Sequence, residues 1–154
     1  GGYSGKLAGV GFQLAAERRA YKLGGGGFIA PAQRLTDYKA NKASTDVRKT
    51  TYKPGIAPAN LKGCYPDFVD THLVNGLDVF ERSLPGFVTE DALLIGVETR
   101  TSAPLQITRD SETLRSTSHE NLHPSGEGAG YGGGIVSAAI DGLRIAERIL
   151  QELE

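Results

Sequence analysis

Residues 126–134 of this chain read Gly126-Glu127-Gly128-Ala129-Gly130-Tyr131-Gly132-Gly133-Gly134. The apolar residues that follow recur at spacings of three and four, which predicts an amphipathic helix beginning at Ile135. They are Ile135, Val136, Ala139, Ile140, Leu143, Ala146, Ile149, Leu150 and Leu153, and we expect Asp141, Arg144, Glu147, Arg148 and Gln151 to face water. Residues 121–123 before the loop are compatible with a short strand. A strand, a glycine turn and a helix would place free backbone N–H groups at the positive end of the helix dipole, which favours an anion.

Gly128, Gly130 and Gly133 match the G-x-G-x-x-G spacing found in dinucleotide-binding loops. A nucleotide-binding unit also needs a second strand after the helix, but this sequence still has a helical pattern at Glu154. We therefore predict that the loop adds to a ligand held mainly by other residues, or that it serves only as a tight turn that permits close helix packing.

Two stretches resemble the C-terminal part of a bacterial family of FAD-dependent dehydrogenase-like proteins, related to the two-domain flavoproteins of the glutathione-reductase type. The stretches are residues 97–110, which begin Val-Glu-Thr-Arg, and residues 122–142, which contain the glycine loop. The resemblance is dense over residues 92–150. It is thinner over residues 5–85, where the similar residues are Gly11, Gln13, Glu17, Pro31, Gln33 and Pro66.

The resemblance implies an α+β fragment of a flavoprotein. Residues 1–90 would form a substrate-type, inserted lobe, and residues 91–154 would supply the C-terminal strands and helix of an FAD-binding domain, with a lobe boundary near residues 86–91. The glycine loop would lie along the ribityl chain and pyrophosphate of FAD. The cofactor-binding residues would be Arg100, Gly126, Glu127, Gly128, Ala129, Gly130, Gly132, Gly133, Gly134 and Ile135. The partner would be a missing N-terminal Rossmann-type segment of the same protein, without which we expect this chain to bind FAD weakly and to be inactive.

Two of these residues have alternative interpretations. Glu127 would accept hydrogen bonds from the ribityl hydroxyls, or it would only cap the following helix. Arg100 would face the flavin or an anionic substrate, or it would form an ion pair with Glu98 or Asp110. No catalytic residue is predicted, and the consecutive residues 118–120, Ser-His-Glu, do not by themselves give the geometry of a triad.

Composition excludes several classes of function. The chain has 17 basic and 18 acidic residues, so no charge excess predicts nucleic acid as a partner. No apolar run is long enough to cross a membrane. The single Cys64 is compatible with a cytoplasmic protein, and we expect it to be a small, partly buried side chain. Its spacing from the three histidines predicts no metal site.

The first ninety residues predict two further helices. One spans residues 4–23 and ends at Gly24-Gly25-Gly26-Gly27, which forms a flexible connector or brings backbone close to another group. The other follows Tyr65, with Pro66 in its first turn, and ends at residues 84–86. Strands are predicted for residues 28–30, interrupted by Pro31, and for residues 48–53, 92–97 and 105–108, the run at 92–97 being covered on both faces. Residues 36–44 are expected to be mostly loop.

Basic residues cluster in this half, where they form a solvated face or attract an anionic substrate or a nicotinamide phosphate. The basic residues are Arg34, Lys39, Lys42, Arg48, Lys49, Lys53 and Lys62. Two functions are therefore compatible with the sequence. The chain is the C-terminal portion of an FAD-dependent oxidoreductase that acts on an unspecified small molecule, or it is a non-catalytic binding or assembly module that retains a flavoprotein scaffold.

Overall fold

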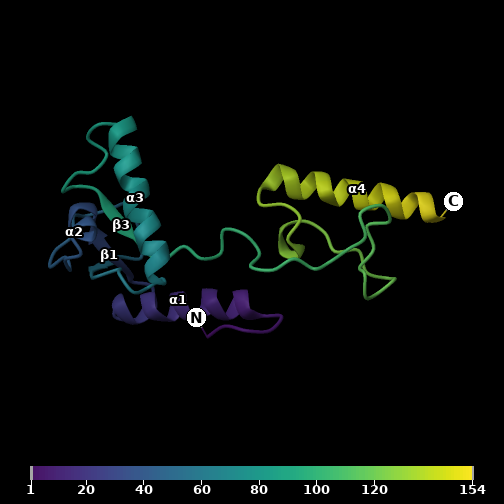
Figure 1. Cartoon of the computed structure of the whole chain (residues 1–154), viewed down its shortest axis with the longest axis horizontal. Helices are drawn as coiled ribbons and strands as arrows, with labels where there is room; N and C mark the ends of the chain where they lie inside the picture. The colour runs from purple at the N-terminus through teal and green to yellow at the C-terminus, as the bar shows by residue number, and fades with distance from the viewer. Residues whose placement is uncertain (1, 154) are drawn as a thin grey trace. The chain divides into compact units, whose positions relative to one another are not determined.

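The computed structural model describes residues 2–153 and has an α+β fold, as predicted (Figure 1). In chain order the elements are α1 (Ala8–Leu23), β1 (Ala30–Arg34), α2 (Leu35–Lys39), β2 (Ile56–Pro58), α3 (Asp67–Ser83), β3 (Leu93–Ile95), the 3-10 helix η1 (Glu127–Ala129) and α4 (Ile135–Leu153). The chain forms two compact units. Leu14–Glu98 form the central unit, and the residues up to Gln13 together with those from Thr99 onward form the terminal unit.

A three-stranded sheet organises the central unit, with β1 in the middle of the order β2-β1-β3. β2 runs parallel to β1, with Ala32 opposite Pro58, and β3 runs antiparallel, with Ala32 opposite Ile95. Gln33 of β1 is fully buried, and both ends of its amide are satisfied. Its Nε2 donates to the Lys42 carbonyl at 2.8 Å, and its Oε1 accepts from the Leu61 N–H at 2.7 Å. The amide therefore joins two loops to the middle strand without an unpaired buried group.

Pro31 lies inside β1, so the expectation that it interrupts a strand at residues 28–30 is wrong. A proline is tolerated here because of the register. The Ala30 N–H and the Ala32 carbonyl bond toward β2, whereas Pro31 faces the other side, where its carbonyl accepts from the Gly96 N–H at 3.0 Å. Gly96 follows the last residue of β3, so the missing proline N–H falls where the ladder ends.

The apolar core of the central unit lies between α1, α2, α3 and the sheet. Its buried members are Ala20, Leu35, Tyr38, Leu61, Cys64 and Leu77. Figure 1 shows α3 lying beside the strands β1 and β3, and partly buried residues such as Val74 and Leu94 extend the cluster from these elements. Burial of Cys64 raises the pKa of its thiol, which favours the protonated and unreactive form.

The helices agree with the sequence patterns more closely than the loops do. α3 begins at Asp67, with Pro66 as its N-cap rather than in its first turn, and its end at Ser83 agrees with the Leu84-Pro85-Gly86 signal. α1 begins at Ala8 rather than Ser4. Gly5 takes a left-handed conformation (φ 82°), and its carbonyl accepts from the Ala8 N–H in a turn that precedes the helix. The expectation of loop over residues 36–44 is wrong for its first part, where α2 buries Leu35 and Tyr38.

The glycine run after α1 combines a helix stop with a close backbone approach. A Cβ on Gly24 would lie 2.2 Å from the Ile29 carbonyl oxygen, so a side chain there would collide with the backbone just before β1. Gly25, Gly26 and Gly27 all have positive φ, which glycine adopts without penalty. Close approach is therefore the reason for Gly24.

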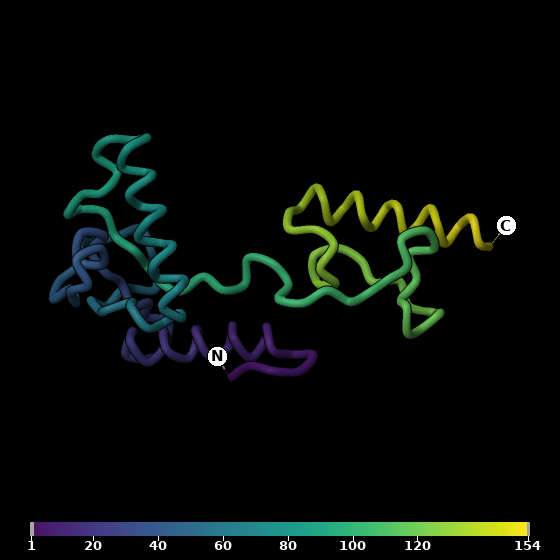
Figure 2. Tube along the Cα trace, viewed as in Figure 1, coloured from purple at the N-terminus to yellow at the C-terminus, as the bar shows by residue number. Residues whose placement is uncertain are grey.

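Several predicted strands are absent or differently placed. Residues 48–53 are not a strand; the strand β2 follows the Pro54-Gly55 turn, because Ile56 and Ala57 pair with β1 whereas residues 49–54 remain exposed. β3 is an edge strand that is only half-buried, not covered on both faces. Residues 105–108 and 121–123 are irregular. Figure 2 shows the path of the chain from residue 105 to residue 123, within which Arg109 and Ser116 form an isolated bridge.

The strand β3 belongs to the central unit because it pairs with β1. This places the change between compact units after Glu98, whereas the predicted lobe boundary lies near residues 86–91. The assignment of residues 1–90 to a substrate lobe and of residues 91–154 to an FAD domain stays a prediction.

Candidate functional site

The glycine loop forms a single tight 3-10 turn in the terminal unit. Gly126 (φ 63°) and Gly130 (φ 84°) flank η1, and both conformations favour glycine. The Gly130 N–H donates to the Glu127 carbonyl at 2.9 Å, and the Tyr131 N–H donates to the Gly126 carbonyl at 2.9 Å. Ala129 is buried under the turn, whereas Glu127 and Gly128 are exposed at its tip. The turn therefore presents one carboxylate beside an open stretch of backbone.

A buried ion pair anchors this turn to α4. Arg109 donates through its two terminal guanidinium nitrogens to Asp141, at 2.6 and 2.9 Å, and its guanidinium lies 3.6 Å from the centroid of the Tyr131 ring. Asp141 also accepts from the Gly126 N–H at 2.8 Å. The hydrogen bond from Arg109 is the main cause that lowers the pKa of Asp141. The expectation that Asp141 faces water is wrong, because its carboxylate binds the glycine loop.

Two glycines of the loop are explained by packing within the protein. A Cβ on Gly130 would lie 2.7 Å from the Leu105 carbonyl oxygen, and a Cβ on Gly132 would lie 2.9 Å from the Ala138 backbone nitrogen. At Gly128 and Gly133, by contrast, a Cβ would meet no protein atom within 4 Å. Gly128 and Gly133 therefore leave room in which an external group could approach the backbone.

A hollow of about 370 Å³ lies beside the tip of the turn. The lining residues come from three separate parts of the terminal unit and are Gln13, Arg100, Ser102, Ala103, Pro104, Glu127 and Gly128. The Gln13 side chain donates to the Thr99 carbonyl at 2.6 Å, which ties α1 to the segment that carries Arg100. Gly9 permits this arrangement, because a Cβ there would lie 2.4 Å from the Pro104 carbonyl oxygen.

The hollow brings together three of the predicted site residues, Arg100, Glu127 and Gly128. The other seven predicted residues do not line it: Gly126, Ala129, Gly130, Gly132, Gly133, Gly134 and Ile135. Ile135 is exposed at the start of α4, and the Gly134 N–H donates to the Ser137 hydroxyl at 3.1 Å. The predicted strand before the loop is absent, so the strand, turn and helix plan is wrong in its first element. The role of these residues toward a cofactor stays a prediction.

Sequence reasoning missed the residues that build the site rather than those at its tip. Gln13 was noted only as a point of resemblance, and no pattern indicated that Ser102, Ala103 and Pro104 would line a hollow. No pattern indicated that Arg109 would form an ion pair with Asp141. A charged residue on an amphipathic helix, such as Asp141, normally indicates the solvent face.

The chemistry of the hollow suits part of an anionic, hydroxyl-bearing ligand. A guanidinium offers several donors in a planar fork, and a carboxylate accepts hydrogen bonds from hydroxyl groups. Gly128 adds backbone that no side chain covers. Among residues 2–153, no group of three or more His, Cys, Asp or Glu side chains is placed to hold a metal ion. No described helix is long and apolar enough to cross a membrane.

Comparison with known proteins places this chain in a family. The family model described as FAD-dependent protein, C-terminal domain-like, matches residues 2–101, well over half of the chain. The chain belongs to this family. The match covers Arg100 and Gln13 and ends before the glycine loop.

A curated relative extends the similarity through the rest of the chain. It is an uncharacterized protein of Clostridium beijerinckii, 41% identical over 153 residues. The aligned region covers 98% of this chain and 28% of the relative. The relative is therefore much longer than the segment described above.

Proposed function

We propose that this chain is the C-terminal portion of an FAD-dependent oxidoreductase, a dehydrogenase related to the two-domain flavoproteins of the glutathione-reductase type. In this proposal the hollow beside the glycine turn faces the ribityl chain and pyrophosphate of FAD. Arg100 binds phosphate oxygens, Glu127 accepts hydrogen bonds from hydroxyl groups, and Gly128 lets the ligand approach the backbone. When bound, the isoalloxazine ring supplies the redox chemistry.

One observation carries this proposal. Arg100 and Glu127 are 27 positions apart in the sequence, yet both line the same hollow with Gly128. These three residues were predicted from sequence as cofactor-binding residues, and a cation, an acceptor and open backbone are the groups that a flavin nucleotide requires.

The residues fit a portion of FAD rather than the whole molecule. Sites for drug-sized ligands occupy about 300–1,000 Å³, and the hollow of about 370 Å³ lies at the lower end of that range. Gly130 and Gly132 contact the protein's own backbone, so their side of the loop is closed by packing. The main pyrophosphate cradle would belong to a Rossmann-type segment of the longer polypeptide, and the isolated chain should bind FAD weakly.

The surface of α4 supports contact with such a segment. Its apolar residues Ile135, Val136, Ile140, Leu143, Leu150 and Leu153 are exposed, whereas Asp141 and Ile145 are buried against the terminal unit. A helix that presents most of its apolar surface outward requires a further partner. The longer relative offers one in the same polypeptide, because 28% of its length aligns with this chain.

The same apolar surface is also compatible with the alternative function, a non-catalytic binding or assembly module. The two functions differ in the full-length protein. An oxidoreductase purifies as a yellow protein whose flavin absorbance disappears on reduction, whereas an assembly module is colourless and purifies with a tight protein partner.

The test of the flavin site uses Glu127→Gln and Gly128→Val in the full-length protein. Loss of one charged hydrogen bond in Glu127→Gln should weaken FAD binding about ten- to hundredfold, with turnover preserved at saturating FAD. Gly128→Val should release flavin and keep the fold, because its Cβ meets no protein atom within 4 Å. Glu112→Gln, an exposed residue outside the hollow and outside α4, is the control. Full flavin occupancy in both variants would refute the site. Unchanged affinity with lost turnover in Glu127→Gln would make Glu127 a catalytic group instead.

A further inference from the structure

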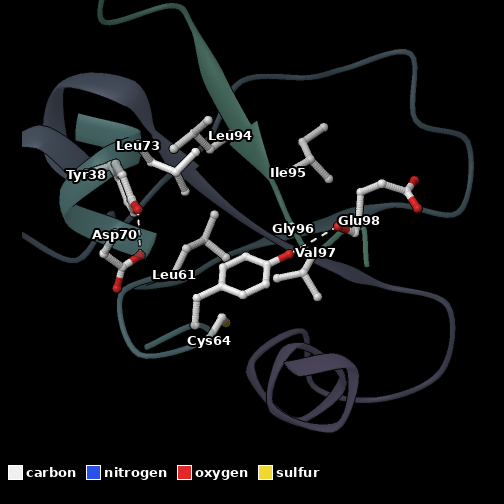
Figure 3. Close-up of a pocket in the computed structure, with 11 residues that line it drawn as sticks. Tyr38, Leu61, Cys64, Asp70, Leu73, Leu94, Ile95, Gly96, Val97 and Glu98 are labelled. Carbon is white, nitrogen blue, oxygen red and sulfur yellow. Dashed lines mark hydrogen bonds between the residues drawn. The ribbon is translucent and has the colours of Figure 1, made fainter. Parts of the chain in front are cut away.

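A second cavity, of about 210 Å³, lies within the central unit (Figure 3). It is bounded by α3, by the end of β3 and by the segment before α3. The lining side chains are mostly apolar and include Leu61, Leu73, Leu94, Ile95 and Val97. Figure 3 shows Leu73, Leu94 and Ile95 on one side of the cavity and Leu61, Cys64 and Val97 opposite them. The cavity is therefore an apolar cleft that is partly open to solvent, since Leu73 and Ile95 are exposed.

The volume of the cavity limits the ligand to about one ring. An apolar cavity of about 150 Å³ is sufficient to bind benzene, so 210 Å³ accommodates a single ring with one or two small substituents. Leu73 is 46% exposed, which leaves a route from solvent to this space. Buried Cys64 contributes a protonated thiol, which acts here as a small apolar wall.

The charged residues that line the cavity, Asp70 and Glu98, are both acidic, and the two tyrosine hydroxyls of the lining already donate to acceptors in the protein. Tyr38 donates to Asp70 Oδ1 at 2.6 Å, and both side chains are buried. The Gly63 N–H reaches Asp70 Oδ2 at 3.2 Å, and Tyr65 donates to the Glu98 carbonyl at 3.1 Å. A carboxylate oxygen can accept further hydrogen bonds beyond these.

No lysine or arginine is among the described residues that line this cavity. The cations nearby have other contacts. Arg19 donates to the Cys64 carbonyl at 3.3 Å, and the Lys62 ammonium lies 5.0 Å from the centroid of the Tyr38 ring. An anionic ligand would therefore bring its charge next to Asp70 without a partner, which is unfavourable in an apolar space.

We propose that this cavity binds a neutral, single-ring molecule that carries one hydrogen-bond donor, such as a phenol, and that it excludes anions of the same size. The ring lies among the leucine and valine side chains, and the donor points to the Asp70 carboxylate. This site is independent of the flavin proposal, because every residue that forms it lies in the central unit and its occupancy needs no cofactor.

Three probes test the proposal on the 154-residue chain by ligand-observed NMR titration. p-Cresol should bind saturably. 4-Methylanisole, which lacks the donor, should bind about ten- to hundredfold more weakly, the typical value of one hydrogen bond to a charged group. 4-Methylbenzoate should not bind. Equal binding of all three probes, or tighter binding of the benzoate, would overturn the proposed polarity of the site.

A pair of variants on α3 locates the binding. Leu73→Trp fills the cavity from its rim, and Val79→Trp places the same side chain on the same helix outside the lining residues. Both positions are about half exposed, so both variants should fold. Leu73→Trp should reduce p-cresol affinity at least tenfold, and Val79→Trp should leave it unchanged. Equal affinity in the two variants, or no p-cresol binding to the unmodified chain, would refute the site.

Discussion

The two compact units keep their structure by different means. The central unit has an apolar core in which Leu35, Tyr38 and Leu77 pack with their neighbours between helices and a sheet. The terminal unit is joined through the Arg109–Asp141 ion pair, and the longest apolar helix in the described chain turns most of its apolar residues outward. The difference indicates that the central unit has a core of its own, whereas the terminal unit has apolar surface left for another partner.

Position along α4 shows this contrast most directly. Asp141 and Ile145 are one turn apart and are both about 6% exposed, whereas Leu143 between them is 65% exposed. The buried side of α4, which packs against the rest of the terminal unit, thus includes a charged residue. The more apolar side of α4 is exposed. In an ordinary globular helix the arrangement is the reverse.

The largest effect is expected for Asp141→Ala. Removing one partner of a buried ion pair leaves the other charge unpaired, so the terminal unit should lose about 3 kcal/mol of unfolding free energy. The Gly126 N–H would lose its acceptor as well. Hydrogen exchange of peptides from each unit, followed by mass spectrometry across a urea series, measures the two units separately. Glu147→Ala on the exposed side of α4 is the control, and similar loss of protection in both variants would contradict the anchoring role of Asp141.

A second and smaller effect should appear in the pH dependence, with opposite sign in the two units. The pKa of Asp141 is lowered from 3.8, chiefly by its hydrogen bond with Arg109, so its stabilisation is present above that value and is lost as the pH falls below it. In the central unit, burial raises the pKa of Tyr38 above 10.0 and that of Cys64 above 9.0. Stabilisation from these neutral forms is present below those values and is lost as the pH rises.

The same unit-resolved exchange measurement, made at acidic, neutral and alkaline pH, checks this expectation. The terminal unit should lose protection first in acid, and the central unit first in alkali. Cys64→Ala should reduce the alkaline loss in the central unit only. If both units lose protection together at each extreme of pH, the proposed contrast between the apolar core of the central unit and the ion pair of the terminal unit is wrong.

The long helices α1, α3 and α4 were predictable from this sequence because their signals are local, whereas the short α2 was missed. Pro66 before α3, the glycines after α1 and the apolar period from Ile135 each act within a few residues. Strands were predicted poorly, because β2 has only three residues and its stability comes from pairing with β1, 26 positions away at Ala30 and Ile56. Pro31 in the middle strand contradicts local preference and is permitted only by the register.

The candidate site was predictable at its tip but not at its base. Glu127 and Gly128 lie in a motif, and Arg100 lies in a stretch with a family resemblance. Arg109 and Asp141 also lie in the stretches of family resemblance, but neither the motif nor the resemblance indicated their ion pair, which joins positions 32 apart. The helical period also predicted that the apolar residues of α4 lie along one side of the helix. The period does not show whether another segment contacts that side.

The smallest effect in the isolated chain is expected for Leu143→Ala, and its size should change in the longer protein. Because Leu143 is already exposed, truncating it should alter the unfolding free energy of the 154-residue chain by less than about 0.5 kcal/mol. If another segment covers α4 in the full-length protein, the same truncation should cost about 2–4 kcal/mol there, as it does for a buried leucine. Urea unfolding of both proteins measures the difference, and Arg144→Ala, its exposed neighbour, is the control. An equally small effect of Leu143→Ala in the full-length protein would mean that this face of α4 stays in contact with water, and the proposed contact with the rest of the polypeptide would then have to lie elsewhere.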